Sequence, residues 1–218
     1  MLIYWIRNDF RFIDNESLNY FLKCKDKKIC LFSYDEDKFK DRSAQKWWLY
    51  KSLTKFRNNL EKKKLKFHFD LNNETEAIKR IIKKIKINKV IWNKIYLNKE
   101  IEIENNIIKI LNQNKIEYNV FGSNLLLDPS KTRKKNDTPF QVFTPFWKNE
   151  ENIYIKNYNY KNNKIKLEKD NIYKTYKEFE KILPKKKWYK KFEKYWCTGE
   201  SEANNKINEF INKQIFTY

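Results

Sequence analysis

Five short apolar segments alternate with amphipathic helical patterns through the first 121 residues of this chain. The apolar segments occupy residues 2–6, 28–34, 65–69, 89–92 and 116–121. Apolar residues spaced three and four apart predict helices between them, over residues 16–23, 43–60, 73–87 and 99–112. Strands and helices that alternate in this way form right-handed crossovers around a parallel sheet, which the helices cover on both faces.

The sequence changes character after Gly122. Residues 131–199 contain polar clusters, prolines and stretches rich in Lys, Asn and Tyr, and they predict a long linker. A helical pattern returns over residues 201–215, with Thr198 as the expected N-cap. The predicted fold class is therefore α/β: a Rossmann-like five-stranded parallel sheet with helices on both faces, then a long irregular linker and one C-terminal helix.

A shortage of glycine and histidine excludes several kinds of site. The chain has 2 Gly, 1 His and 3 Cys. A P-loop or a GxGxxG turn needs several glycines, so neither can occur here. The scattered cysteines offer no zinc-binding spacing, and we predict no metal site. Unpaired cysteines fit a reducing compartment, so we expect a cytoplasmic protein. No apolar run reaches the ~18 residues of a membrane span, and we expect no membrane partner.

The net charge of +20 permits two interpretations. It can indicate a nucleic-acid partner. It can also reflect a composition biased to Lys, Asn and Ile, because 42 of the 48 basic residues are lysine. The six arginines are more informative, since the planar guanidinium serves paired hydrogen bonds that lysine cannot make. Two of them, Arg7 and Arg11, follow the first predicted strand.

Ligands of parallel α/β sheets bind outside the carboxyl ends of the strands, where the strand order reverses. The loops at residues 7–15, 35–41 and 93–100 follow predicted strands one, two and four. These three loops are the candidate ligand loops.

Four ordered motifs resemble the DNA photolyase/cryptochrome family. The pattern W-x-R-x-D-x-R-x-x-D-N-x-x-L runs from Trp5 to Leu18. Residues 41–53 resemble the family's helix after strand two, and residues 125–147 contain its L-L-D-P and V-F-T-P-F segments. Residues 196–200, W-C-T-G-E, resemble the entry into its helical domain, with Thr198 in place of the usual proline. The resemblance covers essentially the whole chain.

The resemblance implies an antenna domain over residues 1–130, an interdomain linker over 131–199 and the first helix of a truncated FAD-binding domain over 200–218. In the family, an antenna pigment of the folate or deazaflavin type passes excitation to FAD, which repairs pyrimidine dimers in DNA. We expect the FAD domain to be missing or separately encoded, and this chain alone to be inactive. DNA would then be a partner of the complete protein. The alternatives are a non-enzymatic pigment- or nucleic-acid-binding module and a cryptochrome-like photoreceptor fragment.

The resemblance also suggests candidate site residues, each with a structural alternative. Glu100, Lys46, Arg7 and Arg11 are candidates for pigment binding. Glu100 can instead be a favourable acid in the first turn of a helix, and the two arginines can simply clamp their loop. Aromatic residues that would pack against the second domain are Phe143, Phe146 and Trp147. We predict no catalytic residue in this chain.

Overall fold

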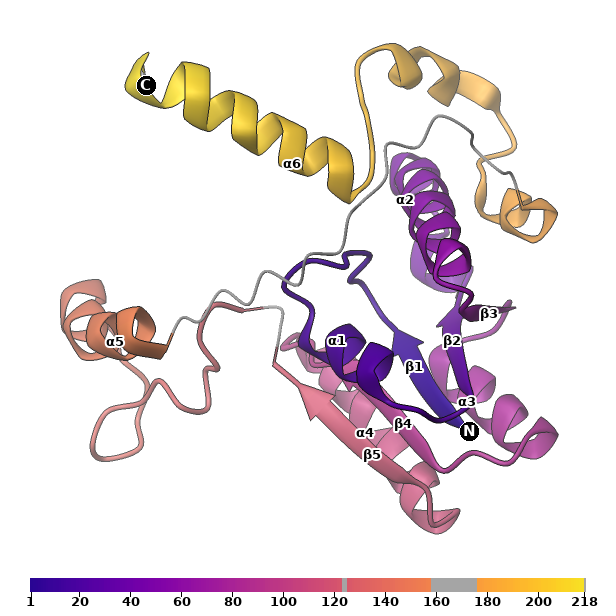
Figure 1. Ribbon diagram of the computed structural model, residues 1–218, viewed down its shortest axis with the longest axis horizontal. Coiled ribbons are helices and arrows are strands. Elements are labelled where there is room, and N and C mark those ends of the chain that lie inside the picture. Colours follow the sequence, from indigo (N-terminus) through magenta and orange to yellow (C-terminus); the bar gives the residue numbers. More distant parts are fainter. Residues whose placement is uncertain (123–124, 158–175, 218) are drawn as a thin grey trace.

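The computed structural model describes residues 1–122, 125–157 and 176–217 (Figure 1). The strands are β1 (Leu2–Ile6), β2 (Lys28–Ser33), β3 (Lys66–Asp70), β4 (Lys89–Asn93) and β5 (Glu117–Phe121). The α-helices are α1 (Glu16–Lys23), α2 (Ser43–Lys62), α3 (Glu74–Lys84), α4 (Asn98–Gln113), α5 (Phe143–Asn157) and α6 (Glu200–Glu209). Shorter 3-10 and π turns are η1 (Asp37–Phe39), η2 (Lys177–Ile182), η3 (Lys187–Lys194), η4 (Phe210–Gln214) and η5 (Ile215–Thr217). All strand pairs are parallel, in the order β3-β2-β1-β4-β5, so the predicted α/β sheet is confirmed.

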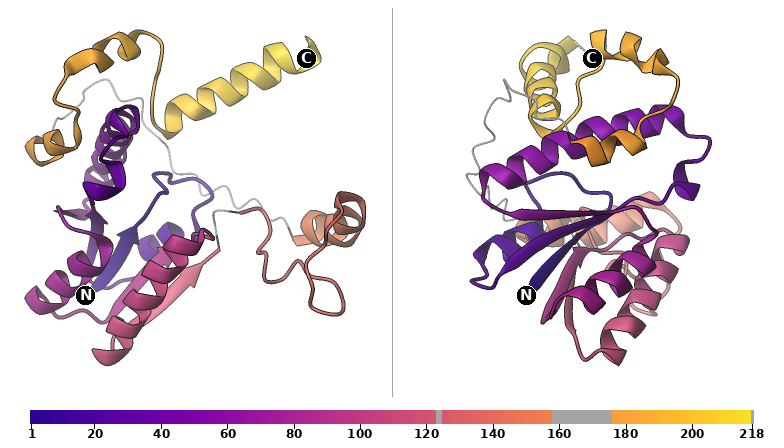
Figure 2. Two further views of the ribbon diagram at one scale, coloured as in Figure 1. Left: turned by 180° about the vertical axis from the view of Figure 1, so that it is seen from behind. Right: turned by 90° about the vertical axis from the view of Figure 1, so that its right-hand side faces the viewer.

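β1 lies at the centre of the sheet and is buried on both faces. Its side chains alternate, as the pleat of a strand requires. Tyr4 packs into one core, with α1 and α2, while Trp5 packs into a second core, with α3 and α4. Figure 2 shows α2 on one side of the sheet and α3 and α4 on the other. This double burial explains why the strand reads as a continuous apolar run.

The ends of the helices follow local capping chemistry. The Asn15 side chain accepts a hydrogen bond from the Leu18 amide at 3.0 Å and so caps the start of α1. The prediction that Thr198 caps the last helix is wrong, because the N-cap is Gly199 with φ of 91°. Few L side chains adopt that angle, and a Cβ on Gly199 would lie 2.7 Å from Cδ of Lys55.

The predicted linker contains regular elements that the sequence pattern did not indicate. α5 continues to Asn157, and both α5 and α6 project from the α/β body (Figure 1). Residues 158–175 of the predicted linker lie outside the described residues. No helix of the described residues is both long and apolar enough to cross a membrane.

Residues 176–183 return to the α/β body and complete one of its cores. The Phe179 ring is fully buried and lies 4.9 Å from the Phe69 ring and 5.8 Å from the Phe67 ring. The guanidinium of Arg57 on α2 stacks 3.8 Å from the centre of the Tyr176 ring. This returning segment therefore covers the outer edge of the sheet at β3.

Replacing Phe179 with Ala should destabilise the protein by about 3–5 kcal/mol, because it leaves a large cavity in a packed core. Urea unfolding of the full chain measures the change. Phe216→Ala is the matched control, since that ring is 90% exposed and its loss should change stability by less than about 0.5 kcal/mol. An unchanged midpoint for Phe179→Ala would show that the returning segment is not part of the core.

Candidate functional site

A crevice opens at the carboxyl ends of β1 and β2, next to the point where the strand order reverses between β1 and β4. Its volume is about 620 Å³. The loops after β1 and β2 and the first turns of α3 and α4 supply its walls. Open α/β sheets bind ligands at such a position. All three predicted ligand loops therefore meet here, since residues of the loops at 7–15, 35–41 and 93–100 line the crevice.

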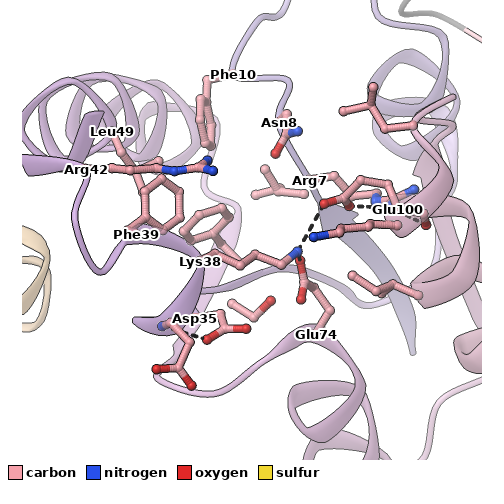
Figure 3. A pocket seen from close by; sticks show the side chains of 17 residues that line it. Arg7, Asn8, Phe10, Asp35, Lys38, Phe39, Arg42, Leu49, Glu74 and Glu100 are labelled. Atoms are coloured by element: carbon pink, nitrogen blue, oxygen red, sulfur yellow. Dashed lines mark hydrogen bonds and ion pairs between the residues drawn. The ribbon is translucent and has the colours of Figure 1, made fainter. Parts of the chain in front are cut away.

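One wall of the crevice is a chain of ion pairs (Figure 3). Arg7 Nη2 lies 2.7 Å from Glu100 Oε2, and Lys38 Nζ lies 3.1 Å from Glu100 Oε1. Lys38 also contacts Glu74 Oε1 at 2.6 Å. Burial of the Glu100 carboxyl opposes its ionisation, but Lys38 and Arg7 outweigh that effect and hold its pKa below the usual range. Glu100 is therefore an ionised acceptor at neutral pH.

Arg7 is fixed from several sides before any ligand binds. Its side chain is 2% exposed, and Nη1 donates to Glu104 Oε2 at 3.1 Å. The same Glu104 oxygen accepts from Trp92 Nε1 at 2.7 Å. The guanidinium also lies 4.7 Å from the centre of the Trp5 ring. The end of β1 is therefore fastened to α4 through one buried cation.

The opposite wall is mostly apolar. Phe10, Phe39 and Leu49 lie there, together with the Arg42 side chain (Figure 3). The Phe10 ring packs against the Phe32 ring at 5.6 Å. The crevice therefore offers an aromatic surface on one side and fixed hydrogen-bonding charges on the other.

A cluster of polar side chains fixes the loop after β1 by hydrogen bonds. Arg11 Nε donates to Asp9 Oδ1 at 3.0 Å, and Asn93 Nδ2 donates to the other Asp9 oxygen at 3.1 Å. Burial raises the pKa of Asp9 in spite of these bonds. The cluster fixes the loop that carries Arg7 and Phe10 into the crevice.

Glu200, far along the chain, also bonds to the loop after β1. The Glu200 carboxylate accepts from the backbone amides of Phe12, at 2.8 Å, and Ile13, at 2.7 Å. Burial raises the pKa of Glu200, although the two amides favour its ionised form. The first residue of α6 is therefore tied directly to the crevice loop.

The structure brings together two of the four predicted pigment-binding residues. Arg7 and Glu100 share the charged wall. Lys46 instead pairs with Glu36, outside the lining of the crevice. Arg11 lies with Asp9 and Asp14 behind the loop, as the structural alternative for it expected.

The predicted interdomain aromatics gather on α5. The Phe143 ring is 70% exposed and stacks on the Trp147 ring at 6.3 Å, with an interplanar angle of 7°. The Phe146 ring lies 6.4 Å from the Phe143 ring. These residues form a partly exposed aromatic cluster that does not line the crevice, and their interdomain role stays a prediction.

Sequence reasoning missed Lys38, Glu74 and Glu104. Lys38 belongs to a loop that the sequence had marked, but its partners are 36 and 62 residues away. Glu74 follows β3, whose loop was not among the candidates. For Glu104 a signal existed, because it is four residues after Glu100 and therefore on the same face of α4.

Comparisons with known proteins agree with this architecture. The family model described as DNA photolyase matches residues 2–159. A deoxyribodipyrimidine photo-lyase of Agrobacterium fabrum is 25% identical over 220 residues, which cover all of this chain and 46% of that protein. The chain thus spans about half the length of the curated relative it matches.

Solved structures share the fold. A bacterial class III photolyase from Agrobacterium tumefaciens aligns with a TM-score of 0.75 at 24% identity, over 97% of this chain and 44% of that one. An archaeal photolyase from Sulfolobus tokodaii aligns at 0.58 and 23% identity, over 68% and 34%. A Synechocystis cryptochrome aligns at 0.57 and 24% identity, over 69% and 33%.

Replacing Arg7 with Met should cost about 3–5 kcal/mol of unfolding free energy, because Glu104 is left as an unpaired buried charge. The double variant Arg7→Met with Glu104→Met removes both charges. Its loss should be smaller than the sum of the two single losses, as a double-mutant cycle of urea unfolding can measure. Additive losses would contradict the buried pairing.

The stability contributed by Glu200 should depend on pH. Its pKa is raised in the folded protein, so the folded state holds the proton more tightly than the unfolded chain. The difference in unfolding free energy between the wild type and Glu200→Gln should therefore fall as pH rises from about 4, the unfolded carboxyl value, through the folded pKa. Urea unfolding at a series of pH values measures it, and a difference that rises with pH would contradict the assignment.

Proposed function

Since the chain belongs to the DNA photolyase family, we propose that it is the light-harvesting part of a deoxyribodipyrimidine photolyase-like protein and that its crevice binds the antenna pigment. The observation that carries the proposal is the crevice itself. It lies at the switch in strand order and sets an aromatic wall opposite the Arg7–Glu100–Lys38 wall.

The two walls fit a flat heteroaromatic ring. Phe10 and Phe39 offer apolar surface on which such a ring can pack. Glu100 is ionised, and each carboxylate oxygen can accept a further hydrogen bond beside the one it takes from Arg7 or Lys38. An amide-like ring edge donates the kind of hydrogen bond that a carboxylate accepts well.

The charge balance of the wall favours such a ring over a polyphosphate. The crevice is lined by equal numbers of basic and acidic side chains, so it carries no surplus of positive charge; the basic ones are Arg7, Lys38, Arg42 and Lys99, and the acidic ones are Asp35, Asp37, Glu74 and Glu100. The loops around it lack the glycines that bring backbone amides against phosphate. The pterin ring of a folate and the ring of a deazaflavin both meet these conditions, and we propose a pigment of one of these two types.

The chemistry that the pigment supplies is absorption of near-ultraviolet or blue light and transfer of the excitation to FAD. The residues of this chain orient the ring between the two walls and exclude water from the charged one. We propose that FAD and the DNA lesion bind to a helical partner domain, which is encoded in the same protein or in a separate chain. Phe143, Phe146 and Trp147 on α5 are the proposed contacts with that domain.

A photoreceptor fragment is the alternative function, because the fold is shared with a cryptochrome as well as with photolyases. Illumination of the chain together with its FAD-containing partner and dimer-containing DNA distinguishes the two. Loss of dimers on illumination indicates repair, whereas unchanged dimers with photoreduced flavin indicate signalling.

Glu100→Gln should weaken pigment binding by about 10- to 100-fold, since it removes a charged hydrogen-bond acceptor. Reduced folate and deazaflavin, added separately to the purified full chain, are the probes, and a shifted near-ultraviolet or blue absorption band is the readout. Glu102→Gln is the matched control because Glu102 is an exposed residue of the same helix. The proposed site would be contradicted if the wild type bound neither pigment. It would also be contradicted if both variants lost the same affinity.

A further inference from the structure

The segment from Lys185 to Trp196 forms a basic and aromatic surface beside α2. It contains six lysines and one glutamate in twelve residues, a net charge of +5, against +20 for all 218 residues. This net charge per residue is about four and a half times the average for the chain. The single acid, Glu193, pairs with Lys51 on α2 at 2.7 Å. We call this segment the η3 surface; its exposed basic residues are Lys185, Lys186, Lys187, Lys190, Lys191 and Lys194.

Large aromatic rings are exposed among these lysines. Tyr195 is 77% exposed, Trp196 is 53% exposed and Trp188 is 37% exposed. A folded protein normally buries such rings, and an exposed cluster of them marks an interaction site. The η3 surface therefore combines exposed cations with exposed ring faces.

Buried neighbours hold this surface in place. Tyr189 is buried, and the Phe192 ring packs edge-on against the buried Trp47 ring of α2 at 5.6 Å. The Trp188 ring packs against the Phe192 ring at 4.9 Å. Trp48, 43% exposed, lies 6.2 Å from Trp196 and extends the row of rings. The exposed rings are thus carried on η3, which packs against α2. Figure 1 shows η3 in orange and α2 in purple.

We propose that the η3 surface binds single-stranded nucleic acid. Lysines neutralise backbone phosphates and release their counterions. Exposed aromatic rings stack on unpaired bases of any sequence, which a duplex keeps stacked inside its helix. None of the residues of the η3 surface lines the crevice, so this site is separate from the proposed pigment site and does not require a bound pigment.

The lysines are tested with a fluorescein-labelled dT20 oligonucleotide, full-length protein and fluorescence anisotropy over a range of salt concentrations. The variant Lys187→Gln, Lys190→Gln, Lys191→Gln should bind more weakly. The slope of log K against log salt should become shallower by about 2, because each phosphate contact on a single strand contributes about 0.7. The matched control is Lys83→Gln, Lys84→Gln, Lys109→Gln, which removes three exposed lysines from α3 and α4, on the other side of the sheet.

The rings are tested in the same assay. Tyr195→Ala should weaken dT20 binding by at least about fivefold, the low end of the range measured for loss of one base–aromatic stack. Tyr195→Phe keeps the ring and should restore binding. Phe216→Ala, which removes another highly exposed ring, should leave binding unchanged.

Three results would overturn the proposal. The first is no binding of dT20 at ~50 mM salt. The second is an equal loss in the control lysine variant, which would mean that net charge alone attracts the strand. The third is tighter binding to a 20-base-pair duplex, or to vesicles containing phosphatidylserine, than to dT20. Each of these readouts is independent of pigment absorption, so the two proposals can fail separately.

Discussion

The buried guanidinium of Arg7 is the interaction on which the candidate site depends. The chain leaves the sheet at this residue, and the loop that follows must diverge from the neighbouring strands for a crevice to exist. Arg7 rests on Trp5 and bonds to Glu100 and Glu104, so it joins the central strand to α4 at that point. A buried charge is costly unless every partner is in place. The same cost makes the arrangement specific, because few other conformations of the loop satisfy all three groups.

Local patterns predicted the elements, and long-range pairings decided the site. The alternation of apolar and amphipathic segments was enough to predict five parallel strands. By contrast, Lys38 meets Glu74 and Glu100 only because the sheet brings together the ends of different strands. Phe179 lies in an irregular, lysine-rich stretch with no periodicity, yet it fills the core at the sheet edge. Gly199 is favoured because its backbone adopts a φ of 91°, and the residues next to it in the sequence do not indicate that angle.

α2 links the two binding surfaces proposed for this protein. Near its amino end, Leu49 faces the crevice, while Trp47 and Trp48 face η3 and Trp196. The two sides differ in chemistry, because one contributes to the apolar wall of the crevice and the other supports the lysines and rings that η3 presents to solvent. A helix of twenty residues packed on the sheet is stiff, so both sides keep a fixed geometry. The basic composition of the chain therefore has a local meaning at η3, although its overall value remains compatible with a bias in residue usage.

The contact of Glu200 with the loop after β1 also bears on the order in which parts of the protein fold during synthesis. Phe12 and Ile13 lie in the loop after β1, near the start of the chain, but the carboxylate that accepts from their amides lies 188 and 187 residues later. The sheet can assemble while the ribosome is still adding the returning segment, since domains fold as their residues emerge. The crevice loop reaches its final form only when α6 has begun. A nascent chain of this protein can therefore hold its α/β sheet before the loop after β1 has gained the two hydrogen bonds that α6 supplies.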